Sequence, residues 1–140
     1  MKLAVDSSSL AKRYVEEYGS DEFDGLLQGA SELALCIILV PEVLSGLNRR
    51  VRDGGLTRKD YGAVKRRLLA DVADAIVLQI TPEVIAQSLK LLEAGGLRAM
   101  DALHLACACE WKADLFVTSD KRQFRAAQKA KITARYLGTT

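Results

Sequence analysis

The sequence is poor in the residues that mark secreted, zinc-bound and membrane-spanning proteins. Its 140 residues contain three cysteines, an odd number without the spacing of a disulfide framework, which is typical of the reducing cytoplasm. There is one histidine, His104, whereas closed zinc sites usually take four nitrogen or sulfur ligands. The longest apolar stretch, residues 33–43, is interrupted by a proline and a glutamate and is too short to cross a bilayer. We therefore expect a cytoplasmic protein that does not enter a membrane.

The start of the chain argues against a secreted protein, and the charge balance by itself does not indicate a partner. The N-terminus reaches an acid at Asp6 without an extended apolar segment, so no signal peptide is predicted. A net charge of +2 is too small to indicate a nucleic-acid-binding protein by itself. With 49% hydrophobic and 27% charged residues, the composition is that of an ordinary globular protein. We expect one domain over residues 1–140.

Short apolar runs alternate with helical periodicity along the chain. The runs predict five strands: Lys2–Val5, Leu33–Leu39, Ala75–Ile80, Leu115–Val117 and Ile132–Leu137. Strands that alternate with helices indicate an α/β fold with a mainly parallel sheet covered on both faces. We therefore predict a three-layer α/β/α sandwich around a five-stranded sheet.

Two of the predicted helices have a defined buried face. In the helix after the first strand, Leu10, Tyr14 and Tyr18 fall at i, i+4 and i+8, and Gly19 ends it. The helix that starts at residues 81–83 is expected to bury a face made of Val84, Ile85, Leu89 and Leu92.

Four acids stand at the ends of these elements. Asp6 and Asp120 follow the first and fourth strands, and Glu42 begins the helix after the second strand. Asp101 lies in the first turn of the helix Ala99–Trp111, which precedes the fourth strand. Ligands of open parallel sheets bind outside the carboxyl ends of the strands. We therefore predict that the four acids converge on one rim of the sheet.

Converging carboxylates need a cation. Two of them within ~4 Å of each other repel by about 4 kcal/mol at an effective dielectric constant near 20. Oxygen ligands without clustered His or Cys favour Mg²⁺ or Mn²⁺. Such ions activate water and stabilise charge on a phosphoryl group. The pattern alone indicates a metal-dependent phosphodiester hydrolase.

The chain resembles the PIN-domain ribonucleases, specifically the VapC-type toxins of toxin–antitoxin pairs. The matching stretches are VDSSSLAKRYVEEYGSDEF, VPEVLSGLNRR, LRAMDALHLACA and DLFVTSD, in the order and near the spacing of the family. Together they cover almost the whole chain. The resemblance implies a PIN-like fold, with strand one beside strand four, and RNA cleavage by a metal-activated water.

The resemblance also implies residue roles and partners. The family's acids, which hold one or two Mg²⁺ or Mn²⁺ ions, carry over onto Asp6, Glu42, Asp101 and Asp120. Ser8 and Thr118 match positions where the family has hydroxyl groups near the metal. Family members form homodimers and bind an antitoxin along a groove near the acids. The residues expected to line such surfaces are Tyr14, Tyr18, Leu44 and Leu47.

The sequence departs from the family pattern in two places. Cys36-Ile37-Ile38 stands where the family often has Ser or Thr, and Lys121-Arg122-Gln123 lacks an aspartate that is sometimes found there. These differences leave the number of metal ions open. They leave the four acids intact.

The basic runs and the histidine each have two readings. Arg49 opens a basic run on the helix that carries Glu42, and it either contacts RNA phosphates or forms a solvated helix face. His104, at i+3 from Asp101, could pair with Cys107 in a zinc site, but packing or a hydrogen bond is the favoured reading.

Two other functions compete with the ribonuclease. A phosphoacceptor receiver domain would need paired acids after the first strand and an acid after the third, and here the first strand is followed by Asp6 alone. A non-catalytic PIN-like module that binds RNA or protein remains open, although an intact set of four acids argues against it.

Overall fold

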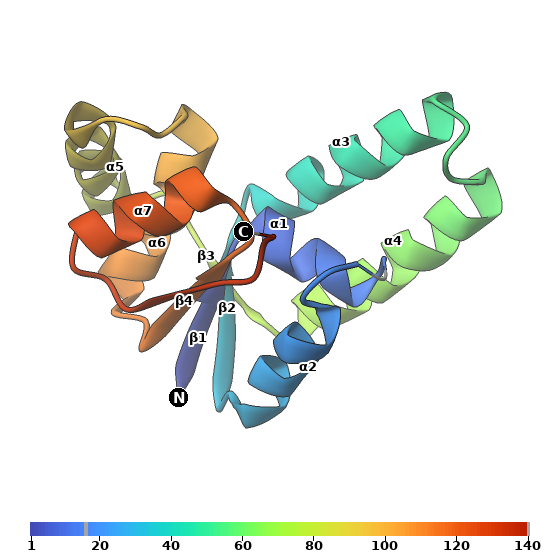
Figure 1. Cartoon of the computed structure of the whole chain (residues 1–140), viewed down its shortest axis with the longest axis horizontal. Helices are drawn as coiled ribbons and strands as arrows, with labels where there is room; N and C mark the ends of the chain where they lie inside the picture. The colour runs from blue at the N-terminus through green and yellow to red at the C-terminus, as the bar shows by residue number, and fades with distance from the viewer. Residues whose placement is uncertain (16, 140) are drawn as a thin grey trace.

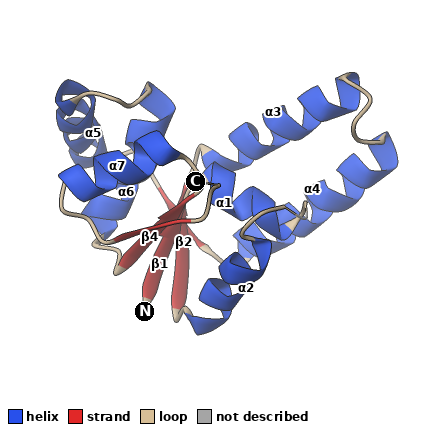
Figure 2. Cartoon of the chain, in the orientation of Figure 1, coloured by secondary structure: helices blue, strands red, loops and turns tan. Residues whose placement is uncertain are grey.

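The computed structural model describes residues 1–15 and 17–139. Five parallel strands form one sheet in the order β3-β2-β1-β4-β5. Figure 2 draws the strands in red, with β1 between β2 and β4. Their bounds are β1 Lys2–Val5, β2 Glu32–Cys36, β3 Ile76–Leu78, β4 Leu115–Thr118 and β5 Ala134–Tyr136. All five predicted strands are confirmed, with shifts of a few residues at their ends. The predicted α/β/α sandwich around a parallel sheet is confirmed as well.

Helices cover both faces of the sheet (Figure 1). One layer contains α1 Ser7–Leu10, the 3₁₀ turn η1 Ala11–Arg13, α2 Ser20–Gly29, α3 Leu39–Arg52 and α4 Arg58–Ala73. The other layer contains α5 Pro82–Ala94, α6 Ala99–Trp111 and α7 Lys121–Lys129. Helices α3 and α4 form a long arm that extends away from the sheet (Figure 1). None of the helices in residues 1–15 and 17–139 has the length and apolar character needed to span a membrane.

Successive side chains of each strand point to opposite faces of the sheet and so contribute to two separate hydrophobic cores. In β1, Leu3 and Val5 pack against α1–α4, whereas Ala4 packs against α5–α7. In β4, Val117 packs on the side of α1–α4 and Phe116 on the side of α5–α7. Because successive side chains of a strand point to opposite faces, a continuous apolar run is what a strand buried on both faces requires.

The helix predicted after Asp6 is wrong in its length. The chain leaves helical geometry after Arg13, and Tyr18 is 65% exposed rather than buried. Nζ of Lys12 donates to the Tyr18 carbonyl at 2.5 Å, and Oγ of Ser20 donates to the Lys12 carbonyl at 3.1 Å, so the chain turns back on itself. Glu16, which falls inside the predicted helix, lies outside the described residues.

Gly19 is required by two features of this turn. Its φ is +88°, a value that L side chains rarely adopt, and a Cβ atom there would lie 2.6 Å from the Leu137 carbonyl oxygen. The turn is therefore held against the C-terminal segment of the chain.

Two predicted faces are also corrected. Helix α5 buries Val84, Ser88 and Leu91, whereas Ile85 and Leu89 are exposed. Leu47, expected on a partner surface, is 6% exposed and belongs to the core. Helix α5 packs against α6, and the local period alone does not determine which of its apolar residues face that helix.

Candidate active site

The site lies where the strand order reverses. Strand β1 pairs with both β2 and β4, and Val5 is in register with Val117. The residues that follow the two strands, Asp6 and Thr118–Asp120, therefore meet at the carboxyl edge of the sheet, which is the usual crevice of open α/β sheets. The prediction that strand one lies beside strand four is confirmed.

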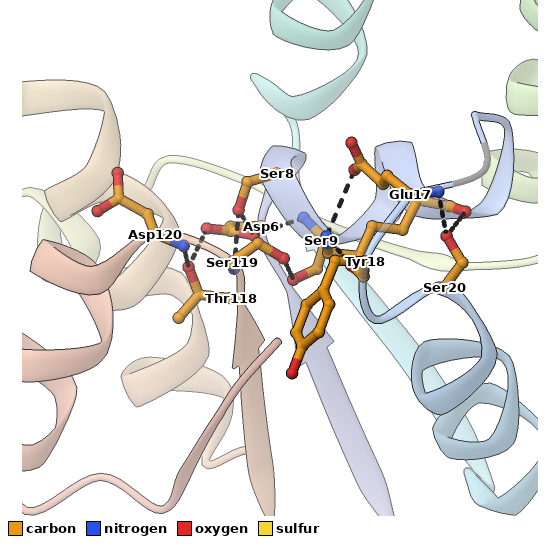
Figure 3. Close-up of polar contacts among 10 residues, drawn as sticks. Asp6, Ser8, Ser9, Glu17, Tyr18, Ser20, Thr118, Ser119 and Asp120 are labelled. Atoms are coloured by element: carbon orange, nitrogen blue, oxygen red, sulfur yellow. Dashed lines mark hydrogen bonds and ion pairs between the residues drawn. The ribbon is translucent and has the colours of Figure 1, made fainter. Parts of the chain in front are cut away.

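Asp6 is buried and fully engaged by hydroxyl and amide donors (Figure 3). Its Oδ1 accepts from Ser8 Oγ at 2.8 Å and from the Ser9 amide at 3.0 Å, and its Oδ2 accepts from Thr118 Oγ1 at 2.5 Å. Asp6 is thus the N-cap of α1. Burial raises the pKa of Asp6 above its ordinary value, although the Thr118 and Ser8 hydroxyls and the Ser9 amide act to lower it.

Hydrogen bonds link Asp6 to the turn that carries Asp120. The Asp120 amide donates to Thr118 Oγ1 at 3.0 Å, and the Ser119 amide donates to Ser8 Oγ at 3.0 Å. The carboxylate of Asp120 points away from Asp6 (Figure 3) and caps α7 through the Arg122 amide at 2.8 Å. The two predicted hydroxyl residues, Ser8 and Thr118, therefore both contact Asp6.

Glu42, in the first turn of α3, is held by two residues from other elements. Its Oε1 accepts from Ser7 Oγ at 2.8 Å and contacts His104 Nε2 from α6. Burial alone would raise the pKa of Glu42, but the hydrogen bond and charge of His104 outweigh it and the pKa is lowered. Burial acts to lower the pKa of His104, and the contact with Glu42 and the charge of Asp6 raise it on balance.

Asp101 lies in the first turn of α6, as predicted. Burial, and then the nearby charge of Asp120, raise the pKa of Asp101. Below it, the buried side chain of Gln123 donates from Nε2 to the Asp101 carbonyl at 2.9 Å. This bond fastens α7 to the first turn of α6 and sets the two aspartates at the same edge.

A cavity of about 430 Å³ opens at this edge. It is lined by residues of both charges: Glu42, Arg98, Met100, Asp101, Asp120, Lys121 and Arg122. No acid pairs with Arg98, Lys121 or Arg122 within 4.0 Å in the described part of the chain. The cavity thus offers carboxylate oxygens beside unpaired cations.

The four predicted acids share this rim at different depths. Glu42, Asp101 and Asp120 line the cavity, whereas Asp6 lies beneath it and reaches Asp120 through Thr118. Within residues 1–15 and 17–139, no three His, Cys, Asp or Glu side chains form a group that could hold a metal ion as they stand. The acids are neighbours at one edge rather than a closed ligand cage.

Arg49 is exposed and lines neither this cavity nor the adjoining one. Its neighbour Arg50 lines a cavity of about 270 Å³ together with Ser7, Ser8 and Glu42. Of these two adjacent arginines of α3, it is therefore Arg50 that faces the rim, whereas the residue predicted from the sequence was Arg49.

Two polar residues of the site, Ser7 and Gln123, were not predicted from the sequence: Ser7 holds Glu42, and Gln123 holds the Asp101 turn. His104 was expected to pack or to form a hydrogen bond, and it does form one, but its partner Glu42 was not predicted. The signal for His104 was its place one helical turn after Asp101, which puts both on one face of α6. Nothing local distinguishes Ser7 or Gln123 from surface polar residues.

The comparisons with known proteins agree with this geometry. The PIN domain family matches residues 3–129. Ribonuclease VapC3 of Pyrobaculum aerophilum is 30% identical over 108 residues, which are 77% of this chain and 82% of the relative.

Solved structures share the fold at low identity. VapC20 of Mycobacterium tuberculosis, described as a sarcin-ricin loop cleaving toxin, superposes with a TM-score of 0.68 at 16% identity, over 89% of this chain and 94% of that one. VapBC2 of Rickettsia felis, bound to a fragment of promoter DNA, superposes with a TM-score of 0.69 at 12% identity, over 97% and 98%.

The parallel α/β sheet with acids at its switch point, together with the family match over residues 3–129, defines the class, that of the PIN domains. The chain belongs to the PIN domain family and, within it, to the VapC-type ribonucleases.

Proposed function

We propose that this protein is an endoribonuclease that hydrolyses RNA phosphodiester bonds with a divalent cation, Mg²⁺ or Mn²⁺, at the rim formed by Asp6, Glu42, Asp101 and Asp120. The observation that carries the proposal is the cavity of about 430 Å³, in which carboxylates and unpaired cations face the same space. Membership in the VapC-type ribonucleases supports the reaction class.

The donor set fits a hard divalent cation. All four candidates are carboxylates, the oxygen ligands that such ions prefer. Burial raises the pKa values of Asp6 and Asp101, which means that the negative charges of their ionised forms are not balanced by positive charge in the metal-free protein. Because the acids do not form a closed group, we infer that Glu42, Asp101 and Asp120 turn toward Asp6 when a cation binds. The bound cation would lower the pKa of a water and stabilise the charge on the phosphoryl group.

The remaining residues would position the acids and the substrate. Ser8 and Thr118 orient the carboxylate of Asp6 through its two oxygens. Arg98, Lys121 and Arg122 would bind phosphates on either side of the cleaved bond, since backbone charge dominates nonspecific affinity for RNA. Arg49, which is exposed on the same helix as Glu42, would contact the RNA further from the site.

The partners follow from the same family. We propose that the protein is the toxin of a toxin–antitoxin pair, binds a cognate antitoxin and forms a homodimer. Solved neighbours of the same fold support the antitoxin partner, since they include a toxin–antitoxin complex from Klebsiella pneumoniae with a TM-score of 0.65.

The reaction is tested by incubating the protein with structured RNA in Mg²⁺, in Mn²⁺ and in EDTA. We expect cleavage only with a metal ion and at least a hundredfold loss in Asp6→Asn, since an electrostatic group at a reaction centre contributes about that much or more. Cleavage that persists in EDTA or in Asp6→Asn contradicts the metal mechanism. RNA binding without cleavage would favour the non-catalytic module instead.

A further inference from the structure

A second, smaller cavity adjoins the acid cavity along α7. It has a volume of about 260 Å³ and is lined by Lys121, Phe124, Arg125, Gln128 and Tyr136. Lys121, the residue directly after Asp120, lines both cavities, so the two are neighbours there.

The aromatic residues of this cavity come from two elements that meet at the carboxyl edge of the sheet. Phe124 lies one helical turn into α7, and its backbone amide donates to the Asp120 carbonyl at 2.9 Å. Tyr136 ends β5 and is in register with Thr118, the residue that contacts Asp6. Their ring centroids are 5.7 Å apart with 35° between the planes. Both rings are only partly buried.

The tyrosine ring is held in place by the end of the chain. Its hydroxyl donates to the Thr139 carbonyl at 2.7 Å. Gly138 lies so close that a Cβ atom there would be 2.2 Å from the tyrosine hydroxyl oxygen. The ring is therefore fixed before any ligand arrives, which lowers the entropy cost of binding.

The cavity also carries unpaired positive charge. Lys121 and Arg125 are exposed at positions i and i+4 of α7, on the same face of the helix. Neither of them pairs with an acid within 4.0 Å in residues 1–15 and 17–139. An aromatic platform flanked by cations is the combination that binds single-stranded nucleic acid, in which bases stack and phosphates are neutralised.

We infer that this cavity, the Phe124–Tyr136 pocket, is a nucleotide subsite that holds one unpaired base of the RNA next to the bond that is cut. The inference rests on the proposed ribonuclease function and adds to it a substrate requirement. The RNA must present an unstacked base beside the cleaved bond, with its phosphate at Lys121. The cleaved position is thus selected by single-strandedness as well as by access to the acids.

The test separates base binding from phosphate binding. In EDTA, the affinities of a short fluorescent oligouridylate and of a ribose–phosphate chain of the same length without bases are measured by anisotropy. The wild type should prefer the oligouridylate by about five- to a hundredfold, the range expected for stacking of one base. Phe124→Leu should lose most of that preference while binding the base-free chain as the wild type does.

Lys121→Gln should act differently. It should weaken both ligands by a similar factor and reduce the slope of log K against log salt by about 0.7, the value for one phosphate contact on a single strand. The matched controls are Tyr18→Leu, an exposed aromatic on the turn before α2, and Lys59→Gln, an exposed lysine in the first turn of α4. Both controls should bind as the wild type does.

Folding is checked by thermal melts, and Tyr136→Leu provides a second aromatic variant if Phe124→Leu melts early. If the folded variants keep the wild-type preference for bases while the wild type cleaves RNA, the subsite inference alone is overturned. If the wild type neither binds nor cleaves RNA, the proposed function falls and the subsite with it. Normal RNA binding with lost co-purification of the product of the adjacent gene would assign the pocket to a protein and also overturn the inference.

Discussion

Asp6 is the residue at which burial and the proposed function conflict most: burial disfavours the negative charge that binding of a cation requires. Its carboxylate is buried, and in the described part of the chain no lysine or arginine pairs with it. Hydroxyl and amide donors hold its geometry, but burial dominates and its pKa is raised. An acid with a raised pKa contributes stability at low pH and loses it as pH rises through the folded-state value. The ionised form therefore destabilises the metal-free protein near neutral pH.

The first prediction concerns this charge. Asp6→Asn removes it and keeps a side chain that can still cap α1. We expect the melting temperature in EDTA to rise near pH 7, by an amount that shrinks toward about pH 3, below the ordinary pKa of 3.8, where Asp6 is protonated in both states. Differential scanning calorimetry at both pH values measures this. An equal loss of stability at the two pH values would mean that Asp6 is only a cap.

The second prediction concerns the pair of Glu42 and His104. The raised pKa of His104 stabilises the fold below its ordinary value of 6.5, and this contribution disappears as pH rises through the higher folded-state value. The lowered pKa of Glu42 stabilises the fold above its ordinary value of 4.5 and is lost as pH falls through the lower folded-state value. His104→Gln, which can still donate a hydrogen bond, should therefore destabilise most between pH 4.5 and 6.5. Urea denaturation in EDTA across this range measures the difference, and a loss that does not vary with pH would contradict the pairing.

Single residues differ in how far the sequence could predict them. The four acids were found because each stands at the end of a strand or the start of a helix, where local pattern is informative. The contacts of Glu42 with Ser7 and His104 join residues 35 and 62 positions away along the chain. Such contacts depend on how α1, α3 and α6 are placed, which no local pattern encodes.

Among the elements, helix α7 is preceded by an N-cap residue, Asp120, that has two roles. Asp120 caps the helix through the Arg122 amide, and its side chain lines the acid cavity. Asn can replace the cap, whereas Ala cannot.

The third prediction separates these roles. Asp120→Ala should lower the free energy of unfolding by about 0.5–2 kcal/mol, whereas Asp120→Asn should change it little. RNA cleavage should fall in both variants, because both lack the carboxylate. Chemical denaturation and a cleavage assay on the same samples measure the two effects. Full cleavage by Asp120→Asn would leave Asp120 with the capping role alone.

The predictions of helices and strands were right where an element is buried on both faces. They were wrong where contacts with distant parts of the chain compete with the local pattern. The strands were confirmed because runs such as Leu115–Val117 are apolar throughout. The helix after Asp6 was predicted too long because the contacts of Lys12 with Tyr18 and Ser20 reverse the chain. The buried face of α5 was predicted incorrectly at Ile85 and Leu89. The apolar residues of this helix occur on several of its faces, so the sequence pattern does not determine which face is buried.

At the scale of the whole molecule, the sheet order creates the site. Because β1 lies between β2 and β4, the acids that follow β1 and β4 come together, and α3 brings Glu42 from the end of β2. The resemblance to the family supplied the pairing of strands one and four, since alternation of strands and helices alone does not determine which strands are neighbours.

The fourth prediction concerns assembly. A homodimer should elute with twice the mass of the 15.3 kDa chain in size-exclusion chromatography with light scattering at micromolar concentration. Co-expression with the product of the adjacent gene should give a larger complex. A mass that stays at 15.3 kDa over the concentration range would contradict the dimer.

The central claim is that the acids act together by holding one cation, and thermal melts of Asp101→Asn test it most directly. The wild type, Asp101→Asn and the control Asp60→Asn, which changes an exposed acid at the equivalent place in the first turn of α4, are each melted in EDTA and in excess Mg²⁺. Asp101→Asn should melt at or above the wild-type temperature in EDTA, because it removes a charge that burial and Asp120 disfavour, and should gain less from Mg²⁺. Asp60→Asn should gain as much as the wild type. An equal gain from Mg²⁺ in all three proteins would show that Asp101 is not a ligand and would contradict the account.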